Sequence, residues 1–242
     1  MRCEMKRMLS GRGFLAAAFL AFVAILSGTA WPAGEESLPA GNFLLLAKQS
    51  FCCKAVSFLL PLTAVLPWSD SFLAEVKGGF LKACLPRQDR RSYTENKILA
   101  VAFGGFLSWM AAGILTIFFY FVVFFPMEQT GSLSFSMVWE SFAVLIRCGL
   151  VGAVLASIGG SVAALFRSAY LAFGFPFAGY YFCLILQERY FPEALWLYPP
   201  QWISGSADWG TGQEGLWLFL LLFLAVTVGL HGGILYGRVE EL

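Results

Sequence analysis

Six long apolar runs constrain the fold of this chain more than any other feature. Several reach the roughly 18 or more residues that a helix needs to cross a bilayer. They are too long and continuous for barrel strands, and in lipid only helices or closed barrels satisfy the backbone. The runs cover Phe14–Ala30, Cys52–Pro67, Ile98–Phe125, Val138–Phe166, Ala169–Leu186 and Gly215–Tyr236. We expect an all-α polytopic membrane protein with six transmembrane helices in a single domain, residues 1–242.

The composition agrees with this class. The chain is 59% hydrophobic and 13% charged, against roughly 45–50% and about 25% in soluble domains. The net charge of +1 gives no indication of nucleic-acid binding.

The distribution of lysine and arginine predicts the orientation. Twelve of the 16 basic residues fall on one side of the six runs, and the positive-inside rule makes that side cytoplasmic. These twelve residues are Arg2, Lys6, Arg7, Arg12, Lys77, Lys82, Arg87, Arg90, Arg91, Lys97, Arg167 and Arg238. Both termini are then cytoplasmic, and the aromatic-rich segment 187–213 forms an outer loop. The N-terminal run, which ends at Ser27–Ala30, also fits a cleaved signal peptide, and cleavage would leave the later orientation unchanged.

The fourth run contains small residues at fourfold spacing, Gly152, Ala156 and Gly160. Such rows let helix backbones approach closely, within a chain or between protomers. Glu140 and Arg147 lie seven residues apart on one face of the same run. An arginine inside a membrane helix indicates a substrate pathway by default, and pairing with Glu140 or snorkelling is the structural alternative.

The sequence offers little support for an enzyme. It lacks the GxxxxGK[ST] motif of P-loop ATPases, and its lone histidine excludes multi-histidine metal centres, so we expect no cofactor or metal of its own. Ser161 and His231 have the order of an intramembrane serine protease of the rhomboid type. Val162 stands where that family requires glycine, which makes the protease the weaker alternative.

The longest polar segment, 68–97, contains an amphipathic pattern. Ser69–Ser71 offers a helix start and Leu85-Pro86 an end, so we expect a cytoplasmic helix of about four turns between the second and third spans. Its apolar arc comprises Phe72, Leu73, Val76, Phe80, Ala83 and Cys84. Its other arc carries Glu75, Gly78, Gly79 and Lys82, and the two glycines favour close approach of another backbone.

This segment resembles a family. A Glu75-x-x-Gly78-Gly79 helix, then Pro86-Arg87-x-x-Arg90-Arg91-x-Tyr93-x-x-x-Lys97, then a span with Gly104-Gly105, is similar to the type-2 (exporter-like) permeases of ATP-binding-cassette (ABC) transporters. The order of six spans and a long outer segment before the last span is similar too.

The resemblance implies a transmembrane permease subunit in a bacterial cell membrane. The helix from Glu75 to Lys82 would be a coupling helix that contacts a separate ATPase subunit, with Arg87, Arg90 and Arg91 beside the contact. ATP would be bound by that partner, and a second permease chain, identical or homologous, would complete the path within the membrane lipids. The alternative is a stand-alone secondary transporter or membrane scaffold.

Overall fold

The structure, a computed structural model, describes residues 2–30, 38–81, 89–129, 131–210 and 213–241. The regular elements within these ranges are all helices, and an isolated β-bridge joins Leu38 to Glu128. The α-helices are α1 (Arg2–Leu9), α2 (Arg12–Ser27), α3 (Asn42–Phe51), α4 (Lys54–Thr63), α5 (Ser71–Lys77), α7 (Arg90–Phe124), α8 (Phe135–Phe166), α9 (Ala169–Arg189), α10 (Pro199–Ser204) and α11 (Gln213–Glu240). Two 3-10 helices are η1 (Phe125–Met127) and η2 (Leu195–Leu197). The predicted all-helical class is confirmed.

Among the described residues, four helices are long and apolar enough to cross a membrane, namely α7, α8, α9 and α11. These are the helices of a membrane protein. The two other predicted spans correspond to α2, an apolar helix of 16 residues, and to the pair α3 and α4, which passes the same test only when its members are taken together.

The second predicted span, Cys52–Pro67, is not one straight helix. The helix α4 begins at Lys54. The preceding helix, α3, is bent by 61° relative to α4, and the break between them lies at Cys52 and Cys53. The thiol of Cys53 caps α4 by accepting a hydrogen bond from the amide of Val56 at 3.4 Å. Gly28 faces this break, and a side chain there would overlap Cys53. The prediction missed α3, since its ten residues include Lys48, Gln49 and Ser50.

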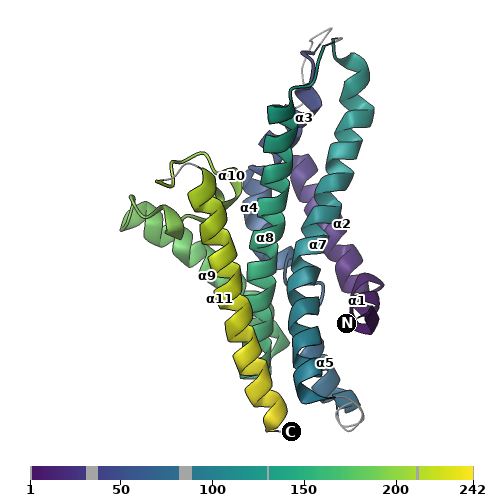
Figure 1. Cartoon of the computed structure of the whole chain (residues 1–242), viewed down its shortest axis with the longest axis vertical. Helices are drawn as coiled ribbons and strands as arrows, with labels where there is room; N and C mark the ends of the chain where they lie inside the picture. Colours follow the sequence, from purple (N-terminus) through teal and green to yellow (C-terminus); the bar gives the residue numbers. More distant parts are fainter. Residues whose placement is uncertain (1, 31–37, 82–88, 130, 211–212, 242) are drawn as a thin grey trace.

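The helix α8 forms the centre of the bundle, between α7 and α11 (Figure 1). Within its most apolar window 78% of the residues are buried, against 17–28% for the three other long helices. The reason is its small residues, which admit neighbours closely. A Cβ on Gly105 of α7 would lie 2.5 Å from the carbonyl oxygen of Gly152 in α8.

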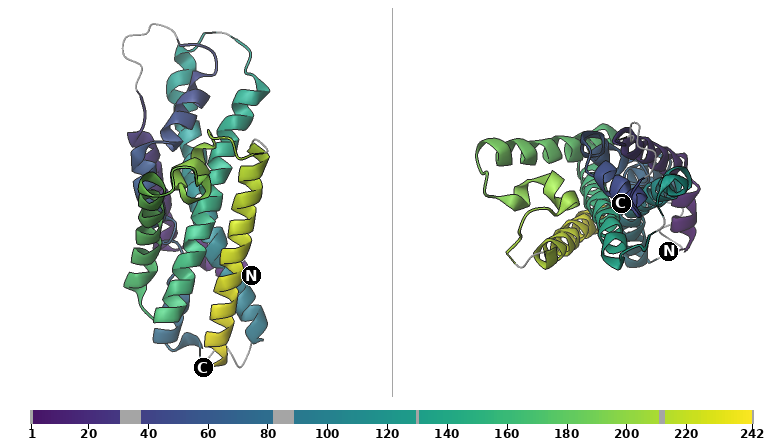
Figure 2. Two further views of the ribbon diagram at one scale, coloured as in Figure 1. Left: turned by 90° about the vertical axis from the view of Figure 1, so that its left-hand side faces the viewer. Right: turned by 90° about the horizontal axis from the view of Figure 1, so that it is seen from above.

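On one side of the bundle α9 diverges from α11, and α10 lies between them (Figure 2). The segment 187–210 therefore folds back toward the bundle. Trp202 and Ile203 of α10 are buried, and α10 packs against α8. Gly205 ends α10 in the left-handed conformation, at φ 59°.

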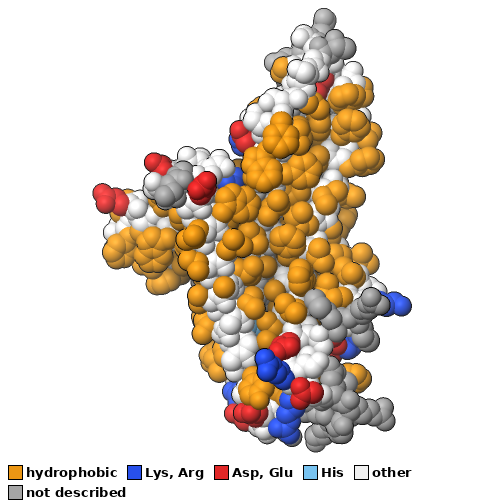
Figure 3. Space-filling view, viewed as in Figure 1, with side chains coloured by type: hydrophobic (Ala, Val, Ile, Leu, Met, Phe, Trp, Pro, Cys, Tyr) orange, Lys and Arg blue, Asp and Glu red, His pale blue; other side chains and the backbone are white. Residues whose placement is uncertain are grey.

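Both chain ends lie in the same half of the molecule as α5 (Figure 1). Hydrophobic side chains cover the middle of the visible face, and charged side chains gather near the end that carries α5 and the C-terminus (Figure 3). An apolar belt with a charged end is the surface expected of a chain embedded in lipid.

Candidate functional site

A buried carboxylate, Glu75, lies at the centre of a polar cluster that joins α1, α5 and α7. Its side chain is only 5% exposed. It accepts hydrogen bonds from the Tyr93 hydroxyl at 2.6 Å and from Arg7 Nη1 at 2.9 Å. Lys97 Nζ lies 2.9 Å from the same carboxylate. Three segments far apart in the sequence therefore meet at one side chain.

Glu4 of α1 is the second carboxylate of this cluster. It lies 3.0 Å from Arg7 Nη1 and 3.0 Å from Lys97 Nζ. It also accepts a hydrogen bond from the indole nitrogen of Trp68 at 3.2 Å. Both cations thus contact both carboxylates, which is the arrangement that makes burial of charge tolerable.

The cluster holds Glu75 in its ionised form. Burial alone would raise the pKa of this carboxyl, because desolvation disfavours the charge. The charge of Lys97, followed by hydrogen bonds from Tyr93, Lys97 and Arg7, outweighs burial and lowers the pKa. At neutral pH the carboxylate is therefore charged, and its ion pairs hold α5 against α7 and α1.

Aromatic rings cover both cations. The Arg7 guanidinium lies 5.7 Å from the centroid of the Trp68 ring and 5.3 Å from that of Phe80. Lys97 Nζ lies 5.5 Å from the Trp68 centroid and 5.7 Å from that of Tyr93. These distances are within the range of cation–π attraction, so the rings further stabilise the contact of α5 with α1 and α7.

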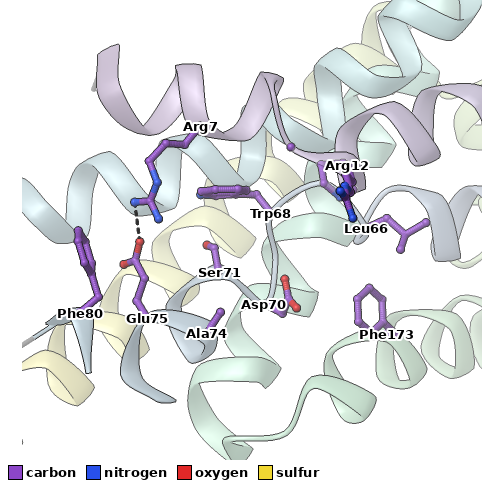
Figure 4. A pocket seen from close by; sticks show the side chains of 13 residues that line it. Arg7, Arg12, Leu66, Trp68, Asp70, Ser71, Ala74, Glu75, Phe80 and Phe173 are labelled. Carbon is purple, nitrogen blue, oxygen red and sulfur yellow. Dashed lines mark hydrogen bonds and ion pairs between the residues drawn. The ribbon is translucent and has the colours of Figure 1, made fainter. Parts of the chain in front are cut away.

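A pocket of about 560 Å³ opens beside the cluster (Figure 4). Its walls come from the α1–α2 junction, the turn before α5, α5 itself and α9. The lining residues are Arg7, Gly11, Arg12, Gly13, Leu66, Pro67, Trp68, Asp70, Ser71, Ala74, Glu75, Phe80 and Phe173. The lining includes no histidine or cysteine, and the described residues contain no group of three or more metal-binding side chains. The arrangement is suited to binding and to mechanical linkage.

The predicted coupling helix is interrupted, because helical structure stops at Lys77 and resumes at Phe80 and Leu81, the last described residues before the gap 82–88. The helix α5 ends at Lys77 after seven residues, since Gly79 takes a left-handed conformation at φ 69°. Gly78 and Gly79 are exposed at the end of the helix, whereas Glu75 is turned inward. Glu75, which the sequence assigns to the same polar arc as these glycines, is therefore buried while the glycines are exposed. Lys82 and Arg87 lie outside the described residues.

Arg90 and Arg91 begin α7 and are exposed. Arg91 Nε donates to Glu95 at 2.9 Å, one helical turn further along. They lie at the end of the bundle that also carries α5.

The small residues of α8 lie at contacts within the chain. Gly152 faces Gly105 of α7, and a Cβ on Gly105 would also lie 2.7 Å from the Ala156 side chain. Gly160 faces His231 of α11, whose Cε1 would lie 2.7 Å from a Cβ at that position. The sequence allows these small residues to form contacts within the chain or between protomers, and the described contacts lie within the chain.

Arg147 and Glu140 do not pair with each other. Glu140 lies 2.6 Å from Lys48 of α3 at the surface. Arg147 is 2% exposed, donates from Nη2 to the carbonyl of Ser204 at 3.2 Å and lies 5.9 Å from the centroid of the Trp217 ring. Its Nε and Nη1 have no hydrogen-bond partner among the described residues. Arg147 thus ties α8 to the end of α10.

Ser161 and His231 show no catalytic geometry. The Ser161 hydroxyl donates to the carbonyl of Ser157 at 2.8 Å. His231 is 1% exposed, and its Nδ1 has no partner within the described part of the chain. Both side chains occupy helix contacts.

Sequence reasoning overlooked Glu4, Arg7 and Trp68 as members of the site. One signal was available, since Glu4 is the single acidic residue in a basic N-terminal stretch. Comparison with known proteins finds no family model and no curated protein that match the chain.

Proposed function

We propose that the chain is the membrane-spanning permease subunit of an ATP-driven transporter whose ATPase is a separate subunit. Six spans would be formed by α2, the bent α3–α4 pair, α7, α8, α9 and α11, with both termini in the cytoplasm of a bacterial cell. A second permease chain, identical or homologous, would complete the transport path.

The observation that carries this proposal is the buried ion pair of Glu75 and Lys97. These two residues are the ends of the motif by which the sequence resembles ABC permeases, and they lie 2.9 Å apart. Through them α5 is linked to α7, and through Arg7 to α1. A partner that displaces α5 would therefore move two further helices as a packed unit.

The surface that faces such a partner differs from the one expected from the sequence. Since Glu75 is turned inward, the exposed residues at the end of α5 are Lys77, Gly78, Gly79 and Phe80. Phe80 is 47% exposed and lies beside the Arg7 guanidinium, which suits an anchor that inserts into another protein. The charge distribution supports a cytoplasmic position of this end.

The test is to isolate the ATPase with the permease. The tagged chain is purified from its native host after crosslinking in the cell, and recovered proteins that carry a P-loop motif are quantified together with ATP hydrolysis. We expect the double variant Lys77→Glu, Phe80→Asp to recover at least about tenfold less ATPase, since contacts at the centre of an interface dominate affinity.

Arg189→Glu is the matched control, because Arg189 is an exposed basic residue at the end of α9 that is distant in the helix from the α8–α9 turn. It should recover the ATPase as the wild-type chain does. Failure of the wild-type chain to recover any ATPase would overturn the proposal and leave the stand-alone transporter or scaffold as the better account.

A further inference from the structure

The pocket beside Glu75 has a feature that the proposed coupling role does not use, the uncapped start of α2. Gly11 is the N-cap of α2 and provides no side-chain hydrogen bond. The first intrahelical bond runs from the amide of Leu15 to the carbonyl of Gly11 at 3.4 Å. The amides of Arg12, Gly13 and Phe14 precede it, and the first two of these residues line the pocket. A helix start of this kind favours an anionic group.

Two arginines add positive charge to the same wall. Arg7 and Arg12 reach the pocket from the α1–α2 side (Figure 4). Arg7 already contacts Glu4 and Glu75. Arg12 lies at the surface and has no ion pair with a described residue. Arg12 is therefore the guanidinium best placed to meet a phosphate.

The opposite wall carries a buried hydroxyl without a partner. Ser71 is 7% exposed, and its Oγ has no hydrogen-bond partner among the described residues. Its side chain rises from the start of α5 toward Trp68 (Figure 4). A buried hydroxyl without a partner costs free energy, which a bound acceptor or donor would recover. Ser71 is thus an independent indication that the pocket takes a polar ligand.

Asp70 supplies negative charge on the same α5 side of the pocket (Figure 4). This carboxylate would repel a simple anion. A ligand with a phosphate and an ammonium group satisfies both walls, since the phosphate can face Arg12 and the start of α2 while the ammonium faces Asp70.

The surroundings indicate that such a ligand carries acyl chains. From the pocket, α2 and α9 continue along the bundle with exposed apolar side chains. Leu15 and Phe19 of α2 are 62% and 65% exposed, and Phe175 of α9 is 54% exposed. The helix α4 packs between them against both. The polar pocket at the end of the bundle matches the headgroup of a phospholipid, and the adjoining apolar surfaces match its acyl chains.

We propose that the pocket between the α1–α2 junction and α5 binds the phosphoethanolamine headgroup of a membrane phospholipid. The phosphate contacts Arg12 and the amides at the start of α2, and Ser71 donates its hydroxyl to a phosphate oxygen. The ammonium lies at Asp70, and the acyl chains follow the exposed faces of α2 and α9. This site is independent of any ATPase.

Native mass spectrometry of the delipidated full chain in detergent tests the site. The probes are phosphatidylethanolamine, phosphatidylcholine, phosphatidylglycerol, diacylglycerol and soluble glycerophosphoethanolamine. Phosphatidylethanolamine should bind about tenfold more tightly than phosphatidylcholine, whose quaternary amine donates no hydrogen bond, and more tightly still than diacylglycerol, which has no phosphate.

Variants locate the site. Arg12→Gln should weaken phosphatidylethanolamine binding by about tenfold, Arg12→Lys should retain part of it, and Ser71→Ala should weaken it less. Asp70→Asn should remove the preference for phosphatidylethanolamine over phosphatidylglycerol. Arg167→Gln, at an exposed position outside the pocket, serves as the control, and thermal unfolding without lipid verifies that each variant is folded.

Three outcomes would overturn the proposal. The first is equal binding of diacylglycerol and phosphatidylethanolamine. The second is wild-type affinity in both Arg12→Gln and Ser71→Ala. The third is displacement of the lipid by glycerophosphoethanolamine at equal concentration, which would assign the pocket to a soluble phosphate compound.

Discussion

Lys97→Met removes a cation from the buried cluster and leaves Glu75 with Arg7 as its remaining cation. Because Glu75 is 5% exposed and Lys97 1%, we expect the free energy of unfolding to fall by about 3 kcal/mol, the lower end for breaking a buried pair. The double variant Lys97→Met, Glu75→Gln should regain part of this loss. Denaturant unfolding in detergent gives both values, and additive losses would show that the two residues are not coupled.

The depressed pKa of Glu75 predicts how stability depends on pH. A carboxyl whose pKa is lower in the folded than in the unfolded state stabilises the fold above the unfolded pKa, here the ordinary value of 4.5. This contribution is lost as the pH falls from there through the folded pKa. Glu75→Gln should therefore flatten the fall in melting temperature below about pH 4.5. An unchanged profile in the variant would contradict the assignment.

At the end of α10, both the backbone conformation and the side-chain packing favour glycine at Gly205. Its φ of 59° is strained for other residues, and a Cβ would collide with Arg147 Nη1 and lie 2.9 Å from Leu216 Cδ2. Gly205→Ala should destabilise the chain by more than the roughly 1–2 kcal/mol that the left-handed conformation alone costs. Gly210, at φ 85° with open space around it, is the matched control. Equal melting temperatures of the two alanine variants would show that the packing at Arg147 contributes nothing.

At the scale of elements, α7 and α8 approach each other closely at Gly105 and Gly152. A methyl group on Gly105 would lie 2.5 Å from a backbone oxygen that cannot rotate away, so Gly105→Ala should separate the helices and destabilise the chain by about 1–3 kcal/mol. Gly174→Ala in α9 meets nothing within 4 Å and should be neutral or stabilising. Thermal unfolding in detergent compares the two, and an equally stable Gly105→Ala would contradict the close packing.

The elements also show what the sequence could predict. Long apolar runs can bury their backbone in lipid only as helices, so α7, α8, α9 and α11 were predictable. The helix α3 was not, because a ten-residue segment with Lys48 has no span-like signal and gains its stability from α7 and α8. The buried position of Glu75 depends on Arg7 and Lys97, which only the tertiary fold brings close. A helical wheel does not include these partners, so it assigned Glu75 to the polar arc.

At the scale of the whole molecule, the proposed six spans place both termini and α5 on one side of the membrane. Single cysteines, introduced in a background without the six native ones, report this with a membrane-impermeant maleimide on intact cells. Cysteines at Lys6, Lys77 and Glu241 should be protected, and cysteines at Ser132 and Asp208 should react; all five positions are exposed in the structure. Permeabilised cells provide the control, in which all five should react.

The labelling also decides how the bent α3–α4 pair is arranged. If this pair crosses the membrane, α2 and α7 begin on the same side, and Lys6 and Lys77 behave alike. If it enters and leaves from one side, Lys77 would be labelled from outside while Lys6 is protected, which would contradict the 2.9 Å ion pair of Arg7 and Glu75. In that arrangement α5 and the start of α7 would lie outside, where no ATP is available. Protection of Lys77 together with Lys6 and Glu241 is therefore the result that the permease proposal requires.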